Sequence, residues 1–192
     1  MTLKWVEPKV WRRILVPDDA TFWDLHVALQ NAMGWEDEHL HKFRVSHPQT
    51  DESQEIGLPI EDLFEDEKPG LVGWEVPLRK YFQHPGNLAE YDYDFGDGWE
   101  HEIVLEAISE VAPRTRLPRC LDGAGACPPE DCGGVSGYEN LLAVLGDPNH
   151  EEHESIFEWL GGTFDPAAFD PKRIQFDHPR LRLLQLMRDR NS

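Results

Sequence analysis

The stretch YDYDFGDGWEHEIVLEAI, residues 91–108, decides the fold class, because its residues alternate as the two strands of a β-hairpin do. Aromatic and aliphatic residues take one set of positions, and acidic residues take most of the other. The turn signal lies between the two runs, where Gly96 and Gly98 flank an aspartate and can supply positive φ angles. We therefore expect a long hairpin over residues 91–108.

The alternation also predicts the register of this hairpin. Residues that face each other across a hairpin share one face of the sheet, and a three-residue loop at 96–98 keeps the two sets of side chains apart. This loop would pair Phe95 with Trp99 and Tyr93 with His101.

The N-terminal half predicts more strands and one helix. Residues 2–16 are rich in β-branched and aromatic residues and divided by Pro8, which is typical of two edge strands. Thr21 and Asp24 form a capping box before a helical apolar stripe that ends at Gly34. We also expect a strand at 39–45, an acidic surface excursion at 47–70 with a short turn near 60–64, and a strand at 71–78.

The C-terminal half predicts a loop followed by helices. Residues 109–135 are rich in Pro and Gly and carry all three cysteines, so we expect a long ordered loop. Ser136 and Glu139 predict a helix start, and a further helix is expected from Asn149 to Gly161. The tail offers two more helix starts, at Asp165-Pro166 and Asp177-His178-Pro179, with inward-facing positions at Leu181, Leu184 and Met187.

Together these elements predict a single α+β domain over residues 1–192. Its sheet is mixed or antiparallel and contains the long hairpin, the N-terminal helix packs on the sheet, and the C-terminal part is helical. The expected parts are a sheet-rich region at 1–110, a cysteine loop at 111–135 and a helical region at 136–192.

The amino-acid composition limits the kinds of binding partner and the cellular compartment that we expect. The chain has 18 Lys and Arg against 37 Asp and Glu, a formal charge of −19, which repels a phosphate backbone and disfavours nucleic-acid binding. No stretch has the length of apolar residues needed to cross a bilayer, and residues 1–17 contain no continuous apolar run of the kind that a signal peptide has, so we expect neither membrane insertion nor secretion. Three cysteines, an odd number, fit a reducing compartment better than a disulfide framework, so we expect a cytoplasmic protein.

Acidic residues of the hairpin are the first candidates for chemistry. The expected register places Asp94 opposite Glu100 and Asp92 opposite Glu102, and like charges across strands destabilise a sheet unless water or a cation screens them. A solvated acidic face is one interpretation, and a site for a hard cation such as Ca²⁺ or Mg²⁺ is the other. Asp97 at the turn is either a turn former or a functional carboxylate.

The histidines have a metal-binding and a structural interpretation. His39 and His41 share one face of the expected strand, about 6.5 to 7 Å apart, so the two imidazoles could converge on one metal. Phe43 and Val45 lie on the same face, so the competing interpretation is a pair of packed core histidines. His101 lies on the aromatic face of the hairpin, where it is either a hydrogen-bonded core histidine or a functional group.

Cys120, Cys127 and Cys132 lie within thirteen residues. Their spacing lacks the tight pair of a zinc knuckle, so free structural thiols and a Zn²⁺ clamp completed by a histidine are both open. The glycines of this loop match neither a P-loop nor a dinucleotide-binding fingerprint.

Three stretches together resemble the plasmid pRiA4b ORF-3-like family: VWRRILVPDDATFWDLHVALQNAMGWEDEHLHKFRV at 10–45, YDYDFGDGWEHEIVLE at 91–106 and CLDGAGACPPEDCGGVSGYENLL at 120–142. The resemblance implies a compact α+β fold with a shared surface near the hairpin and the cysteine loop, and it implies no reaction. It also makes Cys120 and Cys127 better ligand candidates than Cys132. Some relatives carry a transposon-passenger label that suggests a resolvase, but the chain lacks the nucleophilic serine and arginine cluster of that chemistry.

Three functional hypotheses remain open. The first is a cytosolic binding domain for a protein or small molecule, in which the hairpin, the histidine strand and the cysteine loop converge, with or without a structural metal such as Zn²⁺. The second is a metal-dependent hydrolase or nuclease-like enzyme. The third is a mobile-element accessory protein that acts through protein partners, with exposed tryptophans such as Trp35 or Trp74 as anchors. The enzyme hypothesis would use His101 with the carboxylates Asp94, Asp97, Glu100 or Glu130.

Overall fold

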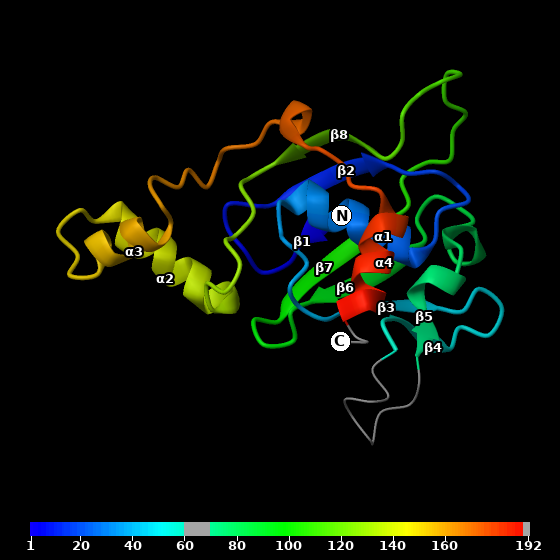
Figure 1. Ribbon diagram of the computed structural model, residues 1–192, viewed down its shortest axis with the longest axis horizontal. Helices are drawn as coiled ribbons and strands as arrows, with labels where there is room; N and C mark the ends of the chain where they lie inside the picture. The colour runs from blue at the N-terminus through cyan, green and yellow to red at the C-terminus, as the bar shows by residue number, and fades with distance from the viewer. Residues whose placement is uncertain (60–69, 190–192) are drawn as a thin grey trace.

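An eight-stranded mixed sheet forms the body of the molecule in the computed structural model, which describes residues 1–59 and 70–189 (Figure 1). The strand order is β5-β4-β3-β6-β7-β1-β2-β8, and all neighbours are antiparallel except the parallel pair β4 and β5. The strands are β1 Thr2–Leu3, β2 Trp11–Leu15, β3 His41–Ser46, β4 Ser53–Gly57, β5 Leu71–Val72, β6 Leu88–Tyr93, β7 Trp99–Val104 and β8 Arg119–Ala124.

One helix covers the core side of the sheet. This helix, α1 Phe22–Met33, begins with the expected capping box of Thr21 and Asp24 and ends at Gly34 in the left-handed conformation. Its Phe22 ring packs edge-on against Phe43 of β3, with ring centroids 5.1 Å apart. Apolar residues of α1 and of the central strands therefore form one core.

The remaining helices follow the strands, as expected, and they differ in how they contact the body. They are α2 Gly134–Gly146, α3 His153–Trp159 and α4 Pro179–Asp189, with short 3-10 turns at η1 Gly73–Glu75, η2 Leu78–Lys80 and η3 Pro171–Arg173. In Figure 1, α2 and α3 extend away from the sheet as an arm, whereas α4 lies on α1. The indole of Trp23 on α1 donates a hydrogen bond to the Pro179 carbonyl, 2.9 Å away.

The hairpin forms, but its predicted register was wrong by two residues on the first strand. Tyr93 pairs with Trp99 and Tyr91 pairs with His101, so the loop spans five residues, 94–98. The reason is Asp94, which leaves the strand with φ of 53° and whose carboxylate accepts hydrogen bonds from the backbone of the loop. A shift of two residues preserves the faces, so the aromatic residues still point to one side.

Several expected boundaries were also wrong. Two strands, β4 and β8, lie where a surface excursion and a loop were expected, and the predicted strand at 71–78 is two residues long before a 3-10 turn. Helix α2 begins after Gly133, without the predicted capping box of Ser136. The turn expected near residues 60–64 lies outside the described residues.

The tail side chains also differ from the prediction. Leu181, Leu184 and Met187 were expected to face inward, yet their exposed fractions are 65%, 52% and 38%. Helix α4 contacts α1 through its other face, so these three side chains remain on the surface.

Candidate functional site

Three segments that are distant in sequence meet beside the hairpin tip: residues 35–39, the loop 94–98 and the cysteine loop. The Trp35 indole donates to the Pro128 carbonyl at 3.0 Å, and the Tyr93 hydroxyl donates to Glu130 at 2.7 Å. These contacts fix the cysteine loop against the hairpin.

The end of the cysteine loop also lies directly against the tip of the hairpin. The backbone N–H of Gly133 donates to the Asp97 carboxylate at 3.1 Å. Gly134 has a φ of 67°, and a Cβ at this position would overlap the carbonyl oxygen of Asp97. Glycine is therefore required where α2 begins.

One side chain from each segment contributes to a group of possible metal ligands, which we call the surface group: His39, Asp94 and Asp131. The His39 Nε2 atom lies 3.2 Å from Asp131 Oδ1 and 3.7 Å from Asp94 Oδ2. Their ligand atoms all lie within 4.8 Å of one another. The His39 Nε2 atom is shielded from solvent and makes no hydrogen bond of proper geometry, while the Asp131 side chain is 66% exposed.

Basic residues neutralise the sheet carboxylates but do not pair with this group. The observed register faces Asp92 with Glu100, and Arg44 pairs with Asp92 while Lys4 pairs with Glu100. Like charges that face each other across two strands need a neutralising cation. Here Arg44 and Lys4 of the chain itself provide it. Within 1–59 and 70–189, by contrast, no Lys or Arg pairs with either aspartate of the surface group.

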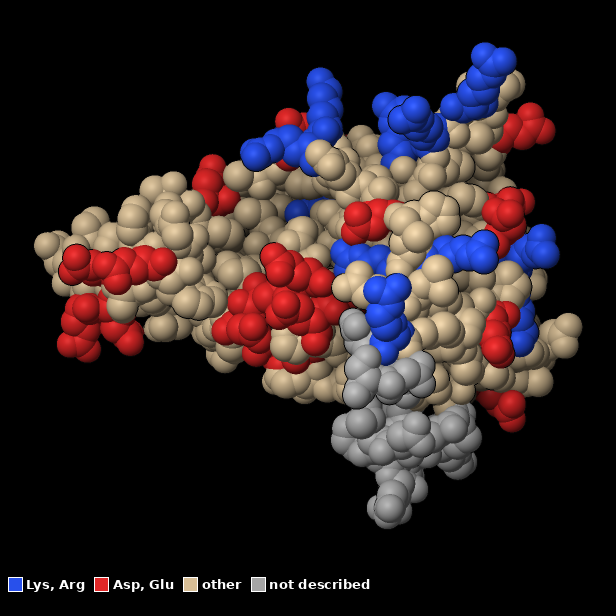
Figure 2. Space-filling view, viewed as in Figure 1, with Lys and Arg blue, Asp and Glu red and all other residues tan. Residues whose placement is uncertain are grey.

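Further carboxylates extend this negative region. Glu130 also accepts a hydrogen bond from the backbone N–H of Glu36, so a second acidic residue, Glu36, lies beside it. Figure 2 shows a dense collection of Asp and Glu side chains between the arm and the sheet. Such a concentration of carboxylates attracts cations.

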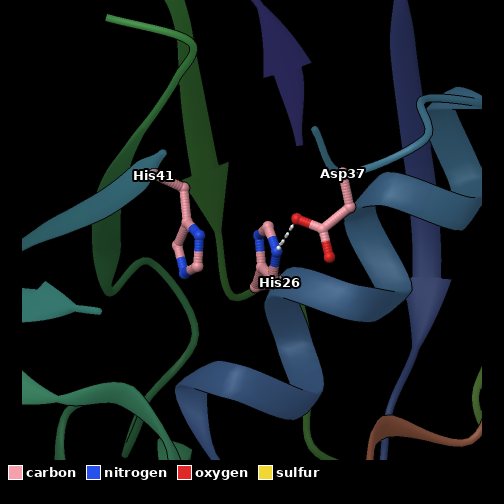
Figure 3. A group of neighbouring side chains, drawn as sticks. All are labelled: His26, Asp37 and His41. Carbon is pink, nitrogen blue, oxygen red and sulfur yellow. Dashed lines mark hydrogen bonds and ion pairs between the residues drawn. The ribbon is translucent and has the colours of Figure 1, made fainter. Parts of the chain in front are cut away.

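A second group, the buried group, lies between α1 and β3 and consists of His26, Asp37 and His41 (Figure 3). The His26 and His41 rings stack with centroids 3.4 Å apart and an angle of 8° between their planes. The His26 Nε2 atom is 2.7 Å from Asp37 Oδ1, and Arg182 of α4 donates to the other oxygen of Asp37 at 3.1 Å.

Hydrogen bonds hold two members of the buried group, His26 and Asp37, whereas the buried Nδ1 atom of His41 has no hydrogen-bond partner among the described residues. Gln30 donates to the Tyr91 hydroxyl oxygen at 2.9 Å, and this hydroxyl lies 2.9 Å from His26 Nδ1. We assign the hydroxyl proton to the bond with Nδ1 and the ring proton to Nε2, which donates to Asp37. Parallel rings also direct their nitrogen lone pairs in parallel planes, rather than toward the single point that a metal occupies.

His41 and His101 are both held neutral by burial. Loss of solvation, with a smaller contribution from His26, holds the pKa of His41 well below its ordinary value. His101 is fully buried, and loss of solvation lowers its pKa to about 4 although its Nδ1 lies 3.0 Å from the Tyr91 carbonyl oxygen. His101 packs edge-on against Trp35 and belongs to neither group.

The structure places the two histidines of the expected strand in different groups. His39 precedes β3 and belongs to the surface group, whereas His41 is the first residue of β3 and belongs to the buried group. Their neighbours in the two groups are different, so one ion held by both is not the arrangement found.

The three cysteines are free thiols. Cys120 is buried on β8, and Cys127 and Cys132 pack partly buried against the core. Burial raises the pKa of all three and brings that of Cys132 to about 12, which favours the protonated thiol. Across the described parts of the chain, no group of three close ligands includes a cysteine, so a thiolate clamp stays a prediction.

Sequence reasoning named His39 and Asp94 but missed the third member of the surface group and most of the buried group. Asp131 follows Glu130 directly in the cysteine loop, but nothing in the spacing shows which carboxylate faces a histidine. Asp37, Asp94 and Asp131 all have positive φ angles, of 65°, 53° and 57°. Aspartate adopts this conformation more readily than most residues, and strained residues gather at functional sites.

Comparisons with known proteins cover most of the chain. The model of the family described as plasmid pRiA4b ORF-3-like protein matches residues 1–173. The chain is 39% identical over 170 residues to the uncharacterized protein y4hQ of Sinorhizobium fredii, covering 88% of this chain and 82% of that protein. The crystal structure of MM3350, a protein of unknown function from Methanosarcina mazei Go1, matches with a TM-score of 0.80 and 42% identity, covering 91% of this chain and 94% of that one.

The structural match supports the α+β fold described above. Helices long and apolar enough to cross a membrane are absent from the described residues.

Proposed function

This chain belongs to the plasmid pRiA4b ORF-3-like family, and we propose that it is a metal-binding domain whose surface group holds a divalent ion such as Zn²⁺. His39, Asp94 and Asp131 would be the protein ligands. The ion would link the segment before β3, the hairpin loop and the cysteine loop.

The chemistry of the donor set suits a borderline cation. One imidazole nitrogen and two carboxylate oxygens are ligands that Zn²⁺ accepts, and a set of three leaves one position of a tetrahedron for water. Small movements of the side chains from 3.2 and 3.7 Å would place an ion between them, since zinc ligands bind at about 2.0 to 2.2 Å.

The position of His39 is the observation that supports the metal-binding proposal most directly. Its Nε2 faces two carboxylates in a region where no Lys or Arg of the described chain pairs with them, and it has no hydrogen bond there. A bound cation would use the nitrogen lone pair and offset both negative charges. A protonated His39 that simply pairs with the carboxylates is the competing interpretation.

Metal titration tests this proposal. Untagged protein freed of metal is titrated with Zn²⁺ by calorimetry, for wild type, Asp131→Asn and Asp19→Asn. We expect one ion per chain, at least tenfold weaker binding for Asp131→Asn, and no change for Asp19→Asn, which removes the same charge from an exposed position elsewhere. Absence of stoichiometric binding, or equal affinity in the three proteins, would show that the surface group is only an ion pair.

Cobalt distinguishes this site from the predicted cysteine clamp. Co²⁺ bound by nitrogen and oxygen lacks the intense thiolate charge-transfer band that Cys120, Cys127 or Cys132 would produce. A thiolate band with loss of titratable thiols would move the metal to the cysteine loop and contradict the proposal for the surface group.

A hydrolytic activity is the second candidate, favoured by the exposure of Asp131, which leaves the ion open to water. Asp97 and Glu130 lie beside the group, where their carboxylates could accept a proton from that water. Hydrolysis of bis-p-nitrophenyl phosphate by the zinc-loaded protein, absent in Asp131→Asn, tests it. Turnover that is unchanged in this variant would exclude the surface group as its origin.

We also propose that the chain acts as one domain in the cytoplasm. Three free thiols suit a reducing compartment, and strands drawn from residues 2–124 join in one sheet, which the cysteine loop connects to the arm.

A further inference from the structure

A small cavity opens beside the surface group, between the cysteine loop and the arm. Its volume is about 220 Å³, and its apolar wall is formed by Leu141 of α2 and by Ile156 and Trp159 of α3. Cys132 and Asp131 of the loop complete the opposite side. The helices thus contribute apolar side chains and one amide, Asn140, to the cavity, and the loop contributes an acidic side chain.

Large apolar side chains lie exposed on helix α3, and one of them, Trp159, lines the cavity. Trp159 is 53% exposed and Phe157 is 41% exposed, and helix α3, seven residues long, buries no side chain. A helix of this length gains little stability by itself, and an exposed tryptophan at a cavity, with further exposed apolar side chains on the same helix, is typical of a contact surface. Tryptophan in particular contributes large binding energies at protein interfaces.

The arm carries charge of one sign only. Residues 120–171 contain no Lys or Arg, and Glu154 and Glu158 lie exposed on α3 itself. In Figure 2 the side chains coloured on the arm are acidic. A charged rim around an apolar centre selects a partner of the opposite charge. The acidic side chains of the arm and the loop therefore favour a basic partner.

We propose that this cavity and its rim bind a segment of a partner protein that places one bulky apolar side chain in the cavity, within a short apolar centre flanked by Lys and Arg. A volume of about 220 Å³ suits a single side chain and lies below the roughly 300 to 1,000 Å³ of pockets for whole small ligands. A second copy of this chain would bring a charge of −19 toward the same acidic rim. Charge complementarity therefore favours a basic partner over self-association.

The cavity does not require the metal, although Asp131 belongs to both places. Binding to the cavity is therefore measured first in EDTA, so that failure of the metal proposal leaves this one to be judged on its own.

Three fluorescent peptides test the proposal by anisotropy: KKGWLGKK, the charge-reversed EEGWLGEE, and KKGAAGKK without the apolar centre. Wild type, Trp159→Ala and Trp5→Ala are compared at 0.15 M salt. Trp5 is 68% exposed and lies before β2 on the body, so it is a matched control for loss of an exposed tryptophan. We expect KKGWLGKK to bind wild type and Trp5→Ala equally, and Trp159→Ala at least tenfold more weakly, with both other peptides at least tenfold weaker on wild type.

Other results would overturn the inference. Equal affinity of KKGWLGKK and KKGAAGKK would mean that the protein recognises only the charge of the peptide. Equal affinity of both tryptophan variants, or no binding of KKGWLGKK, would exclude the cavity as its site. Sedimentation that finds a wild-type dimer dissociated by Trp159→Ala would assign the surface to a second copy instead. Circular dichroism checks that Trp159→Ala keeps its helices.

Discussion

Removal of the titrating side chain of His101 should flatten the dependence of stability on pH below neutrality. In the unfolded chain this imidazole has its ordinary pKa near 6.5, whereas burial lowers the pKa in the folded protein to about 4. Between these two values the unfolded state binds a proton that the folded state does not. The free energy of unfolding is therefore highest above pH 6.5 and falls as the pH falls toward 4.

The size of the effect follows from the width of that window. Each pH unit within it corresponds to about 1.4 kcal/mol, and pH 5 lies about 1.5 units below the pKa of the unfolded imidazole, so His101 should cost about 2 kcal/mol at pH 5 relative to pH 7. Solvent screening does not reduce this figure, because the side chain is fully buried. His41, whose pKa is also lowered, acts in the same direction.

Urea unfolding at pH 5 and pH 7 measures this difference for wild type and His101→Gln. Glutamine keeps an N–H group that can donate toward the Tyr91 carbonyl but does not titrate. Wild type should lose about 2 kcal/mol more than the variant between the two pH values, and His41, present in both proteins, cancels from the comparison. Parallel losses in the two proteins would refute the assignment of a neutral His101.

Three further substitutions follow from buried contacts and close approaches, and each is checked by urea unfolding at pH 7 or by metal titration. Tyr91→Phe leaves two buried polar groups without a partner and should cost about 3 kcal/mol, whereas Tyr93→Phe, with a partly exposed partner, should cost about 1; equal losses would contradict the two buried hydrogen bonds of the Tyr91 hydroxyl. Arg12→Met leaves four backbone carbonyls without their hydrogen-bond donor and should lower the free energy of unfolding by about 4 kcal/mol. A decrease of less than about 1 kcal/mol would show that water replaces the guanidinium. Gly134→Ala must displace a carbonyl of the hairpin loop and should weaken zinc binding, while Gly146→Ala, with open space around its Cβ, should not; equal affinities would separate the loop contact from the metal.

Elements with strong local signals could be predicted from the sequence. Helix α1 has both of its end signals, a capping box and a terminal glycine, and the structure confirms both. The hairpin has clear alternation, so its existence and its faces were correct. The register depended on the backbone of one residue, Asp94, whose positive φ ends the first strand early, and alternation carries no information about that angle.

Strand β8 shows why other elements could not be predicted. Its sequence RCLDGA has little alternation, and it forms because its backbone pairs with β2 at the sheet edge. A Cβ at Gly123 would meet the Phe169 ring and the Trp11 carbonyl, so this glycine allows the tail to cover the strand. These contacts are tertiary, and a local pattern does not contain them.

The same reasoning explains how much of the candidate site could be predicted. Residue types identified His39 and Asp94 as metal-binding candidates, but their partner Asp131 is brought to them by the glycines that let α2 begin against the hairpin. For His39 and His41 the sequence left a shared metal and core packing open, and it did not show that His39 lies just before β3, where the period of two no longer applies.

The distribution of basic residues connects the two proposals. Arg44 and Lys4 neutralise carboxylates on the sheet, and Arg182 neutralises Asp37 of the buried group. The region from the hairpin tip to the end of the arm differs, because residues 120–171 supply acidic side chains and no Lys or Arg. Carboxylates that come together there must remain hydrated or be balanced by charge from outside this region, as Arg13 does for Asp122. A metal ion at the surface group and a basic segment at the cavity are two sources of that charge, and both would act where the sequence leaves its negative charge uncompensated.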